Sequence, residues 1–129
     1  MSKSQTAPSL KTARGLGSAK EGTDHWWMQR LTGVALVPLS VWFVFAAAGL
    51  VGADLTEFKA WVGRHGNPVM LILLTVAMFH HTVLGMQVVI EDYVHSETAK
   101  VVSLTVVNLL AWLCGASCIF AVLRLAFGG

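Results

Sequence analysis

Three long runs of apolar residues dominate the pattern of hydrophobic and polar positions along this chain. Leu31 to Gly52, Pro68 to Ile90 and Val101 to Leu123 contain no Asp, Glu, Lys or Arg. Each run exceeds the roughly 20 residues that a helix needs to cross a hydrocarbon core about 30 Å thick. Because backbone polar groups in lipid must be paired within their own segment, each run is expected to be a helix. The pattern predicts an all-α integral membrane protein with three transmembrane helices.

The composition supports this class and sets its size. The 129 residues are 55% hydrophobic and 12% charged, whereas a soluble domain carries about 25% charged residues. The length indicates a single membrane-anchor domain over residues 1–129. Residues 1–20 are rich in Ser, Thr, Ala, Gly and Lys, which predicts a flexible tail. The net charge of +2 is too small to indicate a nucleic-acid partner.

Basic residues near the spans predict the orientation. The N-terminal segment and the second connection carry six of them, and the opposite side carries three. The first set is Lys3, Lys11, Arg14, Lys20, Arg30 and Lys100, and the second is Lys59, Arg64 and Arg124. Since cytoplasmic loops carry an excess of Lys and Arg, the N-terminus is expected in the cytoplasm and the C-terminus outside.

Residues around the ends of the first span suggest how it meets the interface. Trp26 and Trp27 before it, and Trp61 after it, suit the aromatic belts found at both membrane surfaces. Asp24 is a residue type that caps helix N-termini. It is expected to cap a short interfacial helix over residues 25–30.

Polar side chains gather on the second span. At 100° per residue, Gly85 and Asp92 lie within about 40° of the direction of His81. Tyr93 is offset by about 120° and His80 by about 100°, so Tyr93 borders that face and His80 points away from it. Gly85, one turn from His81, removes a side chain from the same face. The backbone there is expected to leave room for a bulky planar ligand.

The depth of these residues limits what they can do. Asp92 follows His81 by eleven residues, a rise of roughly 16 Å. His81 is therefore expected near mid-membrane, with Asp92 and Tyr93 at the cytoplasmic boundary. A neutral imidazole at that depth suits an axial ligand of haem iron. It equally suits a hydrogen bond to a neighbouring helix, and His80 competes with His81 for the ligand role.

The segment from residue 81 to 93 carries a resemblance to a known family. His81 is followed four residues on by Gly85 and then by Met86, and the pair Asp92–Tyr93 lies eleven and twelve residues beyond the histidine. This pattern resembles the hydrophobic membrane-anchor subunit of succinate dehydrogenase, the D subunit or cytochrome b556-type anchor of complex II. The expected three-span topology with a cytoplasmic N-terminus is similar to that family's.

The resemblance implies partners and cofactors. Two anchor subunits would form a heteromeric helix bundle that holds an iron–sulfur subunit and a flavoprotein subunit on the cytoplasmic face of a bacterial inner membrane. A haem b between the anchors would take one axial histidine from each, with His81 as the ligand from this chain. Arg30 would pair with a haem propionate. Tyr93 would hydrogen-bond the carbonyl of ubiquinone, and Asp92 would support that site.

These roles suit the side chains, although plainer interpretations stay open. Tyr93 is a neutral donor and can polarise a quinone carbonyl without adding a buried charge. Asp92 also fits a solvated carboxylate at a helix end. Arg30 can form a bidentate pair with a carboxylate, or can act as an interfacial anchor that reaches toward headgroups.

Residues of the third span suggest packing. Cys114 and Cys118 share a face, but two ligands do not make a zinc site, which needs three or four. The run over residues 111–117 is rich in small residues and predicts close helix packing. Asn108 is expected to hydrogen-bond another helix.

The expected function is therefore that of a succinate dehydrogenase subunit with no complete active site of its own. It would pass electrons from succinate to ubiquinone in the respiratory chain and the tricarboxylic acid cycle. Two alternatives belong to other classes: a cofactor-free structural anchor or assembly protein, and a small proton-relay transporter using the histidine pair and Asp92. A third is the anchor of a fumarate reductase working in the opposite direction.

Overall fold

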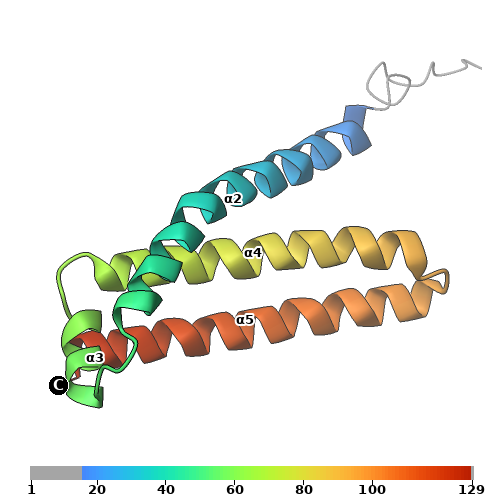
Figure 1. Ribbon diagram of the computed structural model, residues 1–129. Coiled ribbons are helices and arrows are strands. Elements are labelled where there is room, and N and C mark those ends of the chain that lie inside the picture. The colour runs from blue at the N-terminus through green and yellow to red at the C-terminus, as the bar shows by residue number, and fades with distance from the viewer. Residues whose placement is uncertain (1–15, 129) are drawn as a thin grey trace, which may run out of the picture.

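The computed structural model describes residues 16–128, and this part of the chain is built of α-helices. The elements are α2 (Leu16–Gly49), α3 (Leu55–Val62), α4 (Asn67–Tyr93) and α5 (Glu97–Phe127). Helices α4 and α5 run side by side in opposite directions (Figure 1). The N-terminal half of α2 lies away from α4, and the helix then crosses α4 obliquely. The described residues confirm the all-α prediction.

Three of the helices are long and apolar enough to cross a membrane. The spans are Gly22–Gly49, Asn67–Tyr93 and Glu97–Phe127, with 28, 27 and 31 residues. At 1.5 Å per residue each is about 40 Å or longer. Most of their large apolar side chains are exposed rather than packed inside the chain, as expected where lipid or other membrane helices cover them. The protein is a multi-pass membrane protein.

The N-terminal part of α2 differs from the prediction. The helix begins at Leu16 and continues unbroken past Asp24 and Pro38 to Gly49. The expectation that Asp24 caps a separate interfacial helix is therefore wrong. Extending an existing helix avoids the unpaired backbone groups that a new helix end creates. Residues 16–20 are also helical rather than tail, and residues 1–15 of the expected tail lie outside the described residues.

The short helix α3, which the sequence pattern did not predict, closes one end of the bundle near the C-terminal end of α5 (Figure 1). The Asp54 carboxylate accepts a hydrogen bond from the Glu57 amide at 2.8 Å, and the Glu57 carboxylate accepts one from the Asp54 amide at 3.1 Å. This capping box satisfies two free amides at the start of α3. Trp61 stacks on Trp42 of α2 with ring centroids 6.0 Å apart, and Val62 is 1% exposed. The first connection is thereby tied to the spans.

Small residues let α4 and α5 approach closely. A Cβ atom on Gly115 would lie 3.5 Å from the ring of Phe79, at ordinary contact distance. This confirms the predicted packing role of residues 111–117 at Gly115. Cys114 and Cys118 are instead exposed, with free thiols.

We expect Gly115→Leu to weaken the packing of α5 on α4. The added branch would meet the Phe79 ring, and inserting methylenes into a packed contact costs about 1–3 kcal/mol. The midpoint of unfolding in mixed detergent micelles should fall. Gly49→Leu is the matched control, because nothing lies within 4 Å of a Cβ there. Equal losses in the two variants would contradict this account of the contact.

Candidate functional site

The crossing of α2 over α4 brings His81 against α2. His81 follows Asn67, the first residue of α4, by fourteen residues and precedes Tyr93, the last, by twelve, so it lies near mid-helix. Its Nδ1 lies 3.0 Å from the Thr32 hydroxyl oxygen, and Thr32 is 8% exposed. A Cβ on Gly33 would lie 3.4 Å from His81 Cε1. The absence of a side chain at Gly33 thus lets the imidazole pack close to the α2 backbone.

This contact confirms one of the two interpretations of His81 that the sequence left open, the hydrogen bond to a neighbouring helix. The bond occupies only Nδ1. Within the described part of the chain, no hydrogen bond to the other ring nitrogen, Nε2, is formed. Because a metal-bound imidazole uses one nitrogen for the metal and the other for a supporting hydrogen bond, the contact is compatible with iron ligation.

Gly85 does not leave the open backbone surface expected from the sequence. A Cβ on Gly85 would lie 3.6 Å from the side-chain nitrogen of Gln29 on α2. The side chain of Gln29 therefore covers this part of α4. The expectation that a planar ligand presses on Gly85 stays a prediction, and on this side the side chain of Gln29 contacts that position.

Two buried polar atoms lie near this crossing and have no partner among the described residues: His25 Nε2 and Gln29 Oε1. Spacings of four and three residues put His25, Gln29 and Thr32 on one face of α2. Buried polar atoms are nearly always hydrogen-bonded in native proteins. This face of α2 therefore has hydrogen-bonding capacity that a bound group or another chain would satisfy. The sequence pattern did not single out Gln29, although its spacing from Thr32 is a usable signal.

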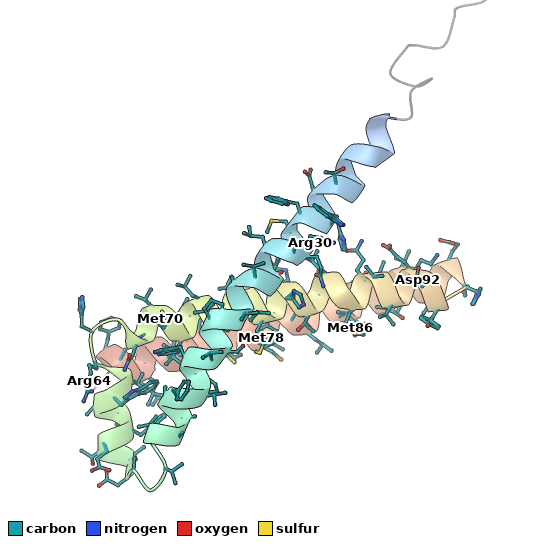
Figure 2. The ribbon with its side chains drawn as sticks, turned by 45° about the horizontal axis from the view of Figure 1, so that its top comes forward. Arg30, Arg64, Met70, Met78, Met86 and Asp92 are labelled. Atoms are coloured by element: carbon teal, nitrogen blue, oxygen red, sulfur yellow. The ribbon has the colours of Figure 1, made fainter. Side chains whose placement is uncertain are left out.

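Arg30 lies within one turn of this crossing, two residues before Thr32. Its guanidinium carbon lies 4.4 Å from the ring centroid of Trp26. In the described part of the chain the only ion pair is Lys100–Glu97, so Arg30 has no carboxylate partner there. Figure 2 shows Arg30 toward the same end of the molecule as Asp92.

Asp92 and Tyr93 end α4 and are both exposed, Tyr93 by 77%. The neighbouring Glu91 accepts a hydrogen bond from Gln87 at 2.8 Å. Tyr93 lies twelve residues beyond His81, which is roughly 18 Å along the helix axis. The structure therefore separates the predicted residues into a mid-helix group around His81 and an end group of Asp92 and Tyr93.

His80 lies on another face of α4. It lines a cavity of about 410 Å³ between α4 and α5, together with Gln87, Asn108 and Trp112. The Asn108 amide donates to the Leu104 carbonyl of its own helix at 2.8 Å. Among the described residues the expected interhelical bond of Asn108 is not formed, because the amide donates to its own helix one turn earlier. The two adjacent histidines thus face different surroundings.

His81 and Arg30 are the kinds of side chain that a haem takes from a protein. No three His, Cys, Asp or Glu side chains of residues 16–128 come close enough to hold an ion. A haem already supplies four nitrogens to its iron and takes single axial ligands from the protein. Among those residues, His81 Nε2 has no hydrogen-bond partner and Arg30 has no carboxylate partner. The two side chains would suit a haem iron and a propionate.

Comparison with known proteins identifies a family that this chain matches. Residues 3–122 match the family described as the succinate dehydrogenase/fumarate reductase transmembrane subunit. The succinate dehydrogenase hydrophobic membrane anchor subunit of Rickettsia conorii is 35% identical over 98 residues, 75% of this chain and 78% of the relative. That of Paracoccus denitrificans is 30% identical over 118 residues, 92% of this chain and 91% of the relative.

The succinate dehydrogenase membrane anchor subunit of Reclinomonas americana is 31% identical over 96 residues, 71% of this chain and 79% of the relative. No solved structure matches the chain. The family match covers most of the chain, including the first two spans, most of the third, and the segment with His81 and Tyr93. The chain therefore belongs to the succinate dehydrogenase/fumarate reductase transmembrane subunit family.

Proposed function

We propose that this chain anchors a succinate dehydrogenase in the bacterial cytoplasmic membrane. In that complex His81 supplies one axial ligand to a haem b shared with a second anchor subunit. Tyr93 and Asp92 form part of the ubiquinone-reduction site. The iron–sulfur and flavoprotein subunits bind at the end of the bundle where α4 finishes, which places the N-terminus in the cytoplasm.

One observation carries the haem assignment. His81 lies near the middle of a membrane-spanning helix, and the Thr32 hydroxyl holds one of its ring nitrogens at 3.0 Å. An imidazole held in this way through one nitrogen presents the other in a fixed direction. A bound b-type haem would accept and release single electrons. The role of this chain is to orient the His81 imidazole and to shield it from water.

The end group supports the quinone assignment. Tyr93 is exposed and ends the same helix, so its hydroxyl can donate a hydrogen bond to a quinone carbonyl oxygen that approaches from the interface. The Asp92 carboxylate, next in the chain and also exposed, can keep contact with water and pass protons toward the reduced quinone.

The proton-relay alternative has less support. A relay needs polar groups that face one another across helices. The hydroxyls of Thr75, Thr82, Thr105 and Ser117 instead donate to the carbonyl four residues earlier in their own helices, at 2.7–2.8 Å. Among the described residues, Thr32 and His81 form the side-chain hydrogen bond that connects two helices. A single such pair does not make a proton path across a membrane.

The proposal is tested by purifying the tagged chain in mild detergent and recording a reduced-minus-oxidised absorption spectrum. A b-type haem signal that travels with an iron–sulfur protein and a flavoprotein is the expected result. The same partners without haem would leave the anchor role and remove the ligand role. A colourless protein without these partners would overturn the proposal.

A further inference from the structure

The distances around the Thr32 hydroxyl favour one direction for its hydrogen bond to His81. The Thr32 hydroxyl oxygen lies 2.8 Å from the Met28 carbonyl, 3.1 Å from the Gln29 carbonyl and 3.0 Å from His81 Nδ1. A hydroxyl has one proton to donate and two lone pairs with which to accept. A carbonyl oxygen can only accept, so the shorter contact, to Met28, favours a proton donated to that carbonyl.

Other hydroxyl side chains of this protein behave in the same way. Thr75, Thr82 and Thr105 each donate to the carbonyl four residues earlier at 2.8 Å. This back-bond is a common arrangement for Thr inside helices. Thr32 differs from these three because a histidine nitrogen from another helix also contacts its oxygen.

With its proton committed to a carbonyl, the Thr32 oxygen can only accept from His81. A neutral imidazole has one protonated and one unprotonated nitrogen. Nδ1 must therefore carry the proton, and the lone pair is left on Nε2. Gly33 leaves room for this arrangement, because an added Cβ there would lie 3.4 Å from Cε1 of the ring. The hydrogen bond and the close packing on α2 together favour one tautomer and one ring position.

We infer that Thr32 is a positioning residue that keeps His81 in the Nδ1–H tautomer, with the Nε2 lone pair directed at the haem iron. The tautomer follows from contacts within this chain, whereas its use in iron ligation rests on the proposed function. A ligating imidazole becomes more basic when its other ring nitrogen donates a hydrogen bond to an acceptor. Losing such a bond typically lowers metal affinity about 10–100-fold.

Thr32→Val and Thr32→Ser separate the hydroxyl from the packing of the side chain. Valine keeps the shape of threonine and loses the acceptor, whereas serine keeps the acceptor and loses the methyl group. Thr105→Val is the matched control, because Thr105 makes the same back-bond in α5 and contacts no histidine within the described residues. Each variant is prepared both as the haem-free full chain in nanodiscs and as the purified complex.

Nitrogen NMR of histidine-labelled, haem-free chain measures the tautomer directly. The His81 signals are identified by their loss in His81→Ala. We expect the wild-type, Thr32→Ser and Thr105→Val chains to show protonated Nδ1 and unprotonated Nε2. We expect Thr32→Val to show a mixture of tautomers. An unchanged tautomer in Thr32→Val, or protonated Nε2 in the wild-type chain, would overturn the inference.

The complex supplies a second readout. We expect Thr32→Val to lower haem affinity about 10-fold or more, to change the g-values of the ferric haem and to move its midpoint potential to a more positive value. Thr32→Ser should restore all three. A serine variant that fails like the valine variant would assign the effect to packing and overturn the role of the hydroxyl.

The two proposals fail in different ways. If His81→Ala leaves the haem spectrum intact, the proposed ligand is wrong, and the NMR measurement on the haem-free chain still reports whether Thr32 sets the tautomer. If His81→Ala removes the haem but Thr32→Val changes neither the tautomer nor the potential, the ligand stands and the positioning role is overturned.

Discussion

His81→Ala is expected to abolish the low-spin b-type haem signal of the purified complex, whereas His80→Ala is expected to preserve it. The alanine removes a coordinate bond to iron. Its effect should therefore exceed the roughly 10–100-fold loss of affinity typical for residues that only support a ligand. The measurement is the ratio of haem to flavin in the complex, together with the reduced-minus-oxidised spectrum.

The two histidines are adjacent in sequence but differ in their surroundings. His81 contacts Thr32 and packs near Gly33 at the crossing with α2. His80 is exposed and lines the cavity between α4 and α5. The substitution pair therefore tests two places in the fold, with the helix, depth and residue type held constant.

Added imidazole distinguishes a missing ligand from a damaged fold. Imidazole can enter the space left by His81→Ala and restore the low-spin spectrum if the rest of the haem site is intact. A spectrum that is lost in His80→Ala and kept in His81→Ala would move the ligand by one residue. The haem iron would then lie at the α4–α5 cavity rather than beside α2.

The three spans could be predicted from sequence because the physical requirement is simple. A run of about 20 residues without charge has few alternatives to a membrane helix. The start of α2 could not be located from Asp24. This residue type often caps a helix, but here it lies inside a helix that begins at Leu16. The start of the short helix α3 is held by the reciprocal hydrogen bonds between Asp54 and Glu57. An acidic pair three residues apart is a sequence signal for such a helix start.

The contacts of the candidate site could not be predicted in the same way. Helical periodicity places His81 and Gly85 on one face of α4, but it does not say which part of α2 crosses that face. The spans are apolar on all sides, so no hydrophobic stripe marks the helix–helix contact. Gln29 opposite Gly85 and Thr32 opposite His81 depend on the position and angle of that crossing.

Small residues could have indicated where the crossing lies. Thr32 and Gly33 are adjacent on α2 and Gly85 lies on α4, and small side chains are enriched where membrane helices meet. The sequence pattern was used for Gly115 on α5, where the packing prediction was confirmed. At Gly85 the sequence predicts room for a ligand, whereas in the structure the side chain of Gln29 contacts that position.

Tyr93→Phe is expected to lower succinate–ubiquinone reductase activity roughly tenfold or more. The hydroxyl would donate a hydrogen bond to a quinone carbonyl, on which negative charge develops as electrons arrive. Losing one neutral hydrogen bond of about 1.4 kcal/mol corresponds to about tenfold, and donors directed at developing charge contribute more. Succinate oxidation by a soluble artificial acceptor should stay at the wild-type rate, because that assay bypasses the quinone.

The position of Tyr93 makes the substitution specific. The side chain is 77% exposed at the end of α4, so removing its hydroxyl should leave the packing of the helices unchanged. Trp112→Phe is a matched control, since Trp112 is also 77% exposed but lies on α5. Equal losses in both assays for Tyr93→Phe would indicate a damaged complex. Full quinone activity in that variant would remove Tyr93 from the site and leave Asp92 as the residue to test.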